Sequence, residues 1–190
     1  ILEEENKNRR VIDEETFNEA QAVAKAYIKD DDDLPIVLHD GGWHPGVIGI
    51  VASRLVEKFY RPTILLTTID GVAKGSARSI SNFNIYEALK NCEDLLLQFG
   101  GHKYAAGLAI EIENIPEFRK KFNSISGTML TEDMLQHEIT ADAALRFQDI
   151  TPRFFRILKQ FAPFGPGNMR PIFFANNVEV YGQPRIVGKD

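Results

Sequence analysis

Two short segments of this sequence combine glycine with side chains that could hold a phosphate group. The first, Lys74–Ser79, contains Gly75, Ser76, Arg78 and Ser79. Serine hydroxyls donate hydrogen bonds, a guanidinium can hold a phosphate by two parallel hydrogen bonds, and glycine lets a ligand approach the backbone. A strand of small residues with one surface arginine would look similar. The segment is therefore a weak phosphate-site candidate when it is taken alone.

The second segment, Gly100–Gly107, is more specific. Gly100 and Gly101, with the alanines that follow, leave the backbone open, while His102 and Lys103 supply donors to an anion. A glycine helix cap followed by an ordinary connection with an exposed histidine would explain the same residues. The residues alone leave both interpretations open.

A third candidate, His44, lies just before an expected helix. The free amide groups and the dipole of a helix N-terminus attract anions, which makes His44 a candidate substrate contact. The neighbouring Trp43 could stack on a base. A lone tryptophan beside a turn more often packs in the core or at its rim, and we expect packing here.

The sequence shows no recognisable metal site. Its 4 histidines and single cysteine include no His pair at i and i+4, no His-x-His and no Cys-x-x-Cys. We interpret the run Asp30–Asp33 as a solvated connector, because consecutive carboxylates point in different directions and repel each other. There is also no Gly-x-Ser-x-Gly elbow and no Gly-x-x-x-x-Gly-Lys loop. We expect this chain to bind no cofactor by itself.

The composition indicates a globular protein with a local rather than a general affinity for phosphate. The chain has 190 residues, of which 44% are hydrophobic and 26% charged, so one or two domains are expected. A net charge of -5 argues against a protein that coats nucleic acid non-specifically through bulk positive charge. The sequence has a single cysteine, Cys92, and it shows no signal peptide and no apolar run of ~20 residues. We therefore expect a soluble cytoplasmic protein without membrane contact.

Strands and helices must hold these segments, and the hydrophobic periodicity predicts where they lie. In the first half we expect a helix over the first thirty residues with Asp13 as a plausible N-cap, a buried strand over 34–39, a helix from Pro45 to Phe59, and strands over 63–69 and 72–80 joined by an Asp70–Gly71 turn. Next we expect a helix capped by Asn84 and ended by the glycines at 100 and 101, a strand over 108–112, and a helix over 116–130.

The pattern changes near His137. Beyond it we expect a strand over 138–147, a short helix opened by Thr151 and Pro152, dense turns over Pro163–Asn168, and strands at 172–174 and 178–181. The expected organisation is a connector helix with an acidic linker (1–33), an α/β domain with a central sheet flanked by helices (34–132), and a further domain (133–190).

Taken together and in order, these segments resemble the RecJ family of single-strand DNA exonucleases. The resemblance covers nearly the whole chain and is carried by Trp43–Arg54, Gly75–Ser79 and Gly100–Gly107, and by Pro163–Asn168 with the Arg170–Pro171 pair. It implies a DHH-associated domain followed by part of an OB-fold. A similar GGH loop occurs in alanyl-tRNA synthetases and in other DHH phosphoesterases, including those that cleave short oligonucleotides or cyclic dinucleotides. The tail with its Pro-Phe-Gly-Pro-Gly-Asn run favours RecJ.

The resemblance implies a 5′-to-3′ exonuclease that degrades single-stranded DNA in recombination and repair. In that family two divalent metals, manganese or magnesium, are held by Asp and His residues of an N-terminal DHH domain. No Asp-His-His stands in this sequence, and both ends look cut. We therefore expect a fragment that is inactive alone, with single-stranded DNA as its partner and a helicase and a single-strand binding protein as further partners.

The resemblance also assigns roles to particular residues. It implies that Ser76 and Arg78 hold the 5′-terminal phosphate, and that His102, with the backbone at Gly100 and Gly101, holds the substrate phosphate beside the metals. His44 is a weaker candidate for the same cleft. In the OB-fold, the loose candidates for single-strand contacts are Arg170, Phe173 and Arg185.

Overall fold

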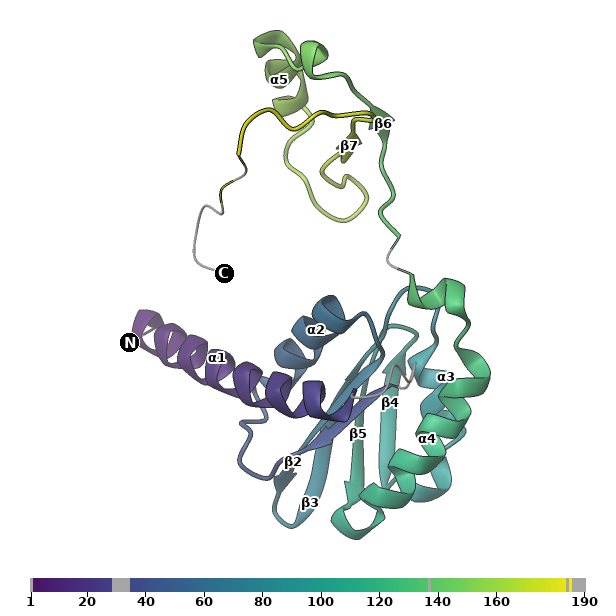
Figure 1. Cartoon of the computed structure of the whole chain (residues 1–190). Coiled ribbons are helices and arrows are strands. Elements are labelled where there is room, and N and C mark those ends of the chain that lie inside the picture. The colour runs from purple at the N-terminus through teal and green to yellow at the C-terminus, as the bar shows by residue number, and fades with distance from the viewer. Residues whose placement is uncertain (1, 29–34, 137, 184, 186–190) are drawn as a thin grey trace. The chain divides into compact units, whose positions relative to one another are not determined.

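The computed structural model describes residues 2–28, 35–136, 138–183 and 185. The chain divides into two compact units, Ile1–His137 and Glu138–Asp190 (Figure 1). The domain limits expected at residues 33 and 132 remain predictions. The run Asp30–Asp33, interpreted above as a solvated connector, lies outside the described residues.

A five-stranded sheet forms the centre of the first unit. Its strands are β1 (Ile36–His39), β2 (Thr63–Ile69), β3 (Val72–Arg78), β4 (Gln98–His102) and β5 (Ala105–Glu111). They lie in the order β1-β2-β3-β5-β4, with β1 and β2 parallel and the remaining neighbours antiparallel. Asp70 and Gly71, both with positive φ, make the tight turn between β2 and β3 that the sequence predicts.

Helices cover both faces of this sheet, which confirms the predicted α/β class. The helices are α1 (Leu2–Tyr27), α2 (Ile48–Phe59), α3 (Ile85–Lys90) and α4 (Ile115–Met129), with 3-10 turns at Glu93–Leu95, Ile112–Asn114 and Glu132–Leu135. α1 and α2 lie on one face, and α3 and α4 lie on the other (Figure 1).

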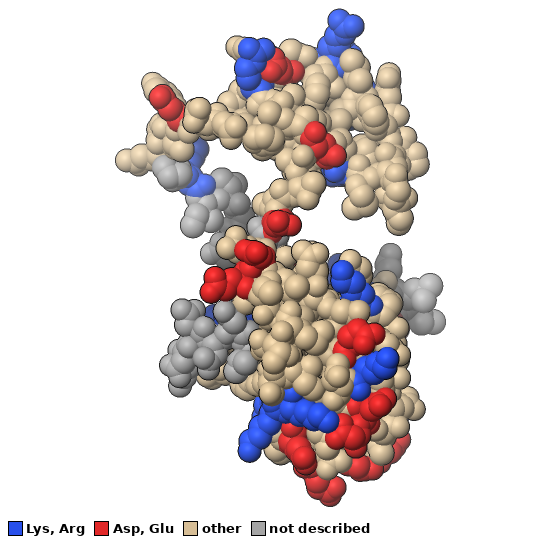
Figure 2. Space-filling view, turned by 90° about the vertical axis from the view of Figure 1, so that its right-hand side faces the viewer, with Lys and Arg blue, Asp and Glu red and all other residues tan. Residues whose placement is uncertain are grey.

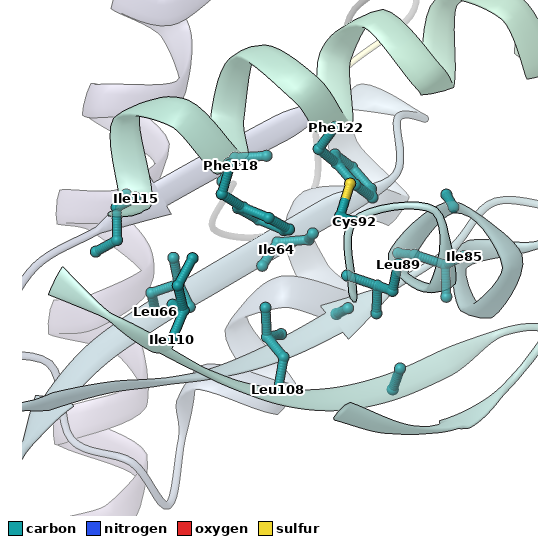
Figure 3. Packing of buried hydrophobic residues seen from close by; sticks show 14 of the residues in the cluster. Ile64, Leu66, Ile85, Leu89, Cys92, Leu108, Ile110, Ile115, Phe118 and Phe122 are labelled. Atoms are coloured by element: carbon teal, nitrogen blue, oxygen red, sulfur yellow. The ribbon is translucent and has the colours of Figure 1, made fainter. Parts of the chain in front are cut away.

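The strands feed two separate cores because their successive side chains point to opposite faces. Leu65 packs with the residues of α1 and α2, whereas its neighbours Ile64 and Leu66 pack under α4. In that second core, Phe118 and Phe122 of α4 point down onto the sheet (Figure 3). The core also encloses Cys92, which is fully buried.

Two details of the predicted helices are wrong. Asp13 is no N-cap, because α1 already begins at Leu2 and Asp13 lies inside it, where its carboxylate accepts a hydrogen bond from Arg54 at 3.1 Å. Pro45 is not in the first turn of α2, which begins at Ile48 after a turn. A proline with a fixed φ fits that turn as well as it fits a helix start.

The helix expected from Asn84 to Phe99 ends at Lys90. Its beginning is as predicted, since the Asn84 side chain accepts a hydrogen bond from the backbone N–H of Glu87. After α3 and the 3-10 turn the chain becomes extended. The helical spacing of its later apolar residues was therefore misleading, because β5 offers a full row of backbone hydrogen-bond partners to an adjacent strand.

The prediction that Gly100 and Gly101 end a helix is consequently wrong as well. Both lie within β4, where Gly100 pairs with Gly107 and Gly101 pairs with Ala106. The Gly100–Gly107 segment is thus a β-hairpin, with its turn at Lys103 and Tyr104, rather than a loop between a helix and a strand.

The second unit has fewer regular elements than expected. It contains β6 (Ala143–Ala144), α5 (Pro152–Lys159) and β7 (Phe173–Phe174), with a 3-10 turn at Phe147–Asp149. α5 begins as predicted, because Thr151 caps it by accepting a hydrogen bond from the N–H of Phe154. The strand expected over 138–147 is only two residues long, and residues 178–181 form no strand. Among the described residues, these segments have too few pairing partners to form a barrel.

Candidate functional site

Ser76 and Arg78 lie on the face of the sheet that α2 covers. Alternate residues of β3 point to opposite faces, and Ala73 and Ala77 are buried in the core beneath α3 and α4. On the other side, the Arg78 Nη2 atom lies 2.9 Å from the position that a Cβ on Gly49 of α2 would occupy. The missing side chain of Gly49 therefore makes room for the guanidinium.

The Arg78 side chain is oriented by its own strand. Its Nη1 atom donates hydrogen bonds to the Ser76 hydroxyl at 2.8 Å and to the Ala77 carbonyl at 2.9 Å. Burial lowers the pKa of Arg78, yet an arginine remains a cation at neutral pH. Within the part of the chain that the structure describes, no hydrogen bond occupies Nη2 or Nε. The guanidinium therefore combines a fixed position with donors that remain available to a ligand.

The strand register brings the two candidate segments onto the same face of the sheet. Gly107 of β5 pairs with Ser76 of β3 on one side and with Gly100 of β4 on the other. One row further along, Ala105 stands between Arg78 and His102 in the same way. Arg78 and His102 are thus two interstrand spacings apart, about 10 Å at the backbone.

His102 is held in one orientation by the turn that follows it. Its Nδ1 atom accepts a hydrogen bond from the backbone N–H of Tyr104 at 3.3 Å. In the neutral ring this bond assigns the proton to Nε2, which is then a donor. Because His102 is exposed, that donor can reach a ligand.

The three glycines of the hairpin differ in what their position requires. Gly101 has φ 152°, and a Cβ there would lie 2.3 Å from the Ala105 carbonyl oxygen, so the fold itself requires glycine. A Cβ at Gly100 would meet nothing within 4 Å, and one at Gly107 would meet only the Gly75 carbonyl oxygen at 3.9 Å. Between Ser76 and His102 the sheet therefore presents bare, accessible backbone.

Ser79 and Lys103 of these segments also make contacts within the protein. The Ser79 hydroxyl donates to the Phe83 carbonyl at 2.8 Å, and the Lys103 ammonium lies 5.3 Å from the centre of the Tyr104 ring. The Lys103 carbonyl accepts a hydrogen bond from the N–H of Ile85, which ties the hairpin turn to the start of α3. The Ser79 side chain and the Lys103 backbone therefore hold the site in shape.

Trp43 packs inside the protein, as expected. It is 4% exposed, and its indole N–H donates to Glu19 of α1 at 3.2 Å, so it offers no face to a base. His44 is exposed and accepts a hydrogen bond at Nδ1 from the Gly46 N–H at 3.0 Å. It borders a cavity of about 390 Å³ whose other lining residues come from α1 and the turn before α2. None of Ser76, Arg78 and His102 lines that cavity. That His44 shares a cleft with these three residues therefore remains a prediction.

Sequence reasoning missed two glycines of this site. Gly49 lies in the first turn of α2, where an alanine would suit the helix better, and that mismatch was the available signal. Gly107 was quoted within a motif, but its position beside Ser76 depends on the register of two strands. The pairing of Gly107 with Ser76 cannot be inferred from the spacing of residues along the chain.

In the second unit, the candidate residues Arg170 and Phe173 contact different partners. The Arg170 guanidinium stands 5.6 Å from the centre of the Phe164 ring, and Phe173 packs edge-on against Phe154 at 5.5 Å. Arg185 is exposed. Their role in strand binding remains a prediction.

On the side of the first unit where α4 lies, Figure 2 shows acidic and basic side chains interspersed. Over residues 2–28, 35–136, 138–183 and 185, no group of three or more His, Cys, Asp or Glu side chains is placed to hold a metal ion. No helix in those ranges is long and apolar enough to cross a membrane.

Comparison with known proteins places this geometry in a family. Residues 32–127 match the model of the DHHA1 domain, and residues 141–190 match that of the RecJ OB domain. The single-stranded-DNA-specific exonuclease RecJ of Bacillus subtilis is 42% identical over 148 residues, which are 77% of this chain and 19% of that protein. Its Escherichia coli counterpart is 33% identical over 175 residues, which are 88% of this chain and 30% of that protein.

Solved structures give the same result. The crystal structure of RecJ from Thermus thermophilus in complex with Mn²⁺ matches this chain with a TM-score of 0.77 and 34% identity. The match covers 90% of this chain and 24% of the Thermus chain. A Mg²⁺ complex of the same protein has a TM-score of 0.76. The chain spans roughly a fifth to a third of the relatives it matches, as these shares show. It belongs to the DHHA1 domain family and, by its DHHA1 and RecJ OB domains together, to the RecJ group within it.

Proposed function

We propose that the first unit grips the phosphates of a single DNA strand, as the substrate-binding part of a 5′-to-3′ exonuclease that acts in recombination and repair. The observation that carries this proposal is the strand register, which brings Ser76, Arg78 and His102 onto one face around the open backbone of Gly100 and Gly107. A cation, a hydroxyl and an imidazole N–H around bare backbone amount to a phosphate site with room for a strand.

The residues have separate tasks in this proposal. Arg78 holds the 5′-terminal phosphate, with Ser76 as its positioning partner and as a second donor. His102 donates from Nε2 to the following phosphate. The backbones of Arg78 and His102 are about 10 Å apart across the sheet, which favours contacts with two neighbouring phosphates over a shared one.

The described residues do not fit a divalent metal, because no cluster of suitable ligands is present among them. The Thermus relatives are described as complexes with Mn²⁺ and Mg²⁺. We place the metal site of the exonuclease in a separate DHH domain, and the roles above therefore use side chains of this chain only. Without that domain the chain should bind DNA and leave it uncut. A helicase and a single-strand binding protein are the partners that such an activity implies.

Two alternatives share the GGH segment. One is a tRNA-binding module of the alanyl-tRNA synthetase type, and the other is a phosphodiesterase for oligonucleotides or cyclic dinucleotides. The match of residues 141–190 to the RecJ OB domain favours the exonuclease over both.

The experiment measures binding of the chain to single strands of DNA that differ only in a 5′-phosphate or a 5′-hydroxyl. Arg78→Ala should weaken binding of the phosphorylated strand by about 1.5 to 3 kcal/mol, as expected for charged hydrogen bonds, and should affect the other strand less. Lys120→Ala removes an exposed positive charge from α4 and serves as the matched control. Equal losses for both strands with Arg78→Ala would reduce its role to a general backbone contact.

A further inference from the structure

Tyr104 is an exposed aromatic side chain at the tip of the β4–β5 hairpin. It is 53% exposed, whereas every other Phe, Tyr and Trp ring described in the first unit is buried or half-buried. The core therefore does not account for this ring. Its position beside the proposed phosphate donor His102 is what suggests a use.

The backbone that carries this ring is fixed by three hydrogen bonds. The Tyr104 N–H donates to His102 Nδ1 at 3.3 Å, and the Tyr104 carbonyl accepts from the Ser79 N–H at 3.0 Å. The preceding carbonyl, that of Lys103, accepts from the Ile85 N–H at 3.1 Å. A ring presented from a fixed backbone loses little further freedom when it binds a ligand.

The groups around the ring suit a nucleotide. The His102 ring stands edge-on to the Tyr104 ring, with centroids 6.4 Å apart and planes at 71°. The Lys103 ammonium lies 5.3 Å from the ring centre. A flat aromatic surface, a hydrogen-bond donor and a cation are thus gathered within one turn, and these are the groups that bind a base and its phosphate.

We propose that Tyr104 stacks on the base of the nucleotide whose phosphate His102 holds. This inference rests on the proposed function and adds a base contact to a site otherwise built for phosphates. Stacking tolerates every base, since each has a flat π-face, so the contact helps to hold a single strand without selecting its sequence.

The test combines variants of Tyr104 with strands that lack single bases. Binding of 5′-phosphorylated single strands is measured in EDTA, with an abasic site at the first, second or third nucleotide. Tyr104→Ala should weaken binding of the intact strand by about 5- to 100-fold, and Tyr104→Phe should keep most of the affinity. With the abasic site at the position that Tyr104 contacts, the variant and the wild type should bind equally.

Leu97→Ala provides the matched control, because Leu97 is 55% exposed and lies before the opposite end of β4. It should bind every strand as the wild type does. A Tyr104→Ala loss that persists at all three abasic positions, or no loss at all, would overturn the inference. The proposed function fails separately, if the wild type does not distinguish a 5′-phosphate from a 5′-hydroxyl.

Discussion

One face of β3 carries Ala73 and Ala77, and the other carries Ser76 and Arg78. The two alanines are fully buried under α3 and α4, where their small side chains let the helices approach the sheet. The serine and the arginine are half-buried beside α2, where the guanidinium donates a hydrogen bond to the serine hydroxyl. Because side chains alternate along a strand, the same seven residues contribute to the core on one face and to the candidate site on the other.

The comparison teaches that stability and ligand binding should separate cleanly between the two faces. Changes on the face under α3 and α4, the closed face, should lower the free energy of unfolding and leave binding by the folded protein intact. We call the face of Ser76, Arg78 and His102 the open face. Changes there should weaken DNA binding and leave the free energy of unfolding nearly unchanged. Three substitutions test this separation.

The largest effect is expected on the closed face, from Phe118→Ala. Phe118 is fully buried and stacks on Phe122 with ring centres 5.6 Å apart. Truncating a buried phenylalanine leaves a cavity and should lower the free energy of unfolding by about 3 to 5 kcal/mol. Urea denaturation measures the loss. DNA binding per folded molecule should be unchanged, and a parallel fall in affinity under folding conditions would show that the faces are coupled.

His102→Ala should be the strongest change on the open face. In the intact exonuclease it should lower kcat by roughly 10² or more, the size expected for one preorganised donor in the transition state. Because His102 is exposed, the free energy of unfolding should fall by no more than about 1 kcal/mol. Single-turnover cleavage and urea midpoints are measured on the same variant. A large stability loss with normal turnover would make His102 structural.

Much of the fold could be predicted where local signals agree. The Asp70–Gly71 turn sets the β2–β3 hairpin, and Asn84 caps α3 through Glu87 as its sequence position suggests. The α4 helix follows from its apolar spacing, with Phe118 and Phe122 on the buried side. In these places the turn chemistry, the capping residue and the periodicity indicate the same structure.

The remainder depended on contacts between distant segments. Apolar residues from Tyr86 to Phe99 repeat at helical spacing, yet the last part pairs as β4 with β5. The candidate residues were found from their types, but their assembly depends on the register that brings Gly107 between Ser76 and Gly100. In the second unit, the described strands β6 and β7 are each two residues long, which is shorter than the β-rich sequence suggests.

The smallest effect, and the sharpest contrast between faces, is expected from Gly107→Ala. The new Cβ would meet only the Gly75 carbonyl oxygen at 3.9 Å, so the substitution fits without strain. Since glycine in a strand is less favourable than alanine, the free energy of unfolding should rise by about 0.5 to 1 kcal/mol. The added methyl group would stand on the open face between Ser76 and Gly100, and DNA binding should therefore weaken.

The matched control for Gly107→Ala is Gly75→Ala, one strand away on the closed face. There a Cβ would lie 2.5 Å from Leu66 Cδ2 and 2.9 Å from Leu108 Cδ2, and overpacking should cost about 1 to 3 kcal/mol. Thermal or urea midpoints and strand affinity are measured for both variants. The free energy of unfolding should rise with Gly107→Ala and fall with Gly75→Ala. If Gly107→Ala stabilises the fold and leaves DNA affinity unchanged, the strand does not lie on the backbone between Ser76 and Gly100, and the phosphate contacts must come from the side chains alone.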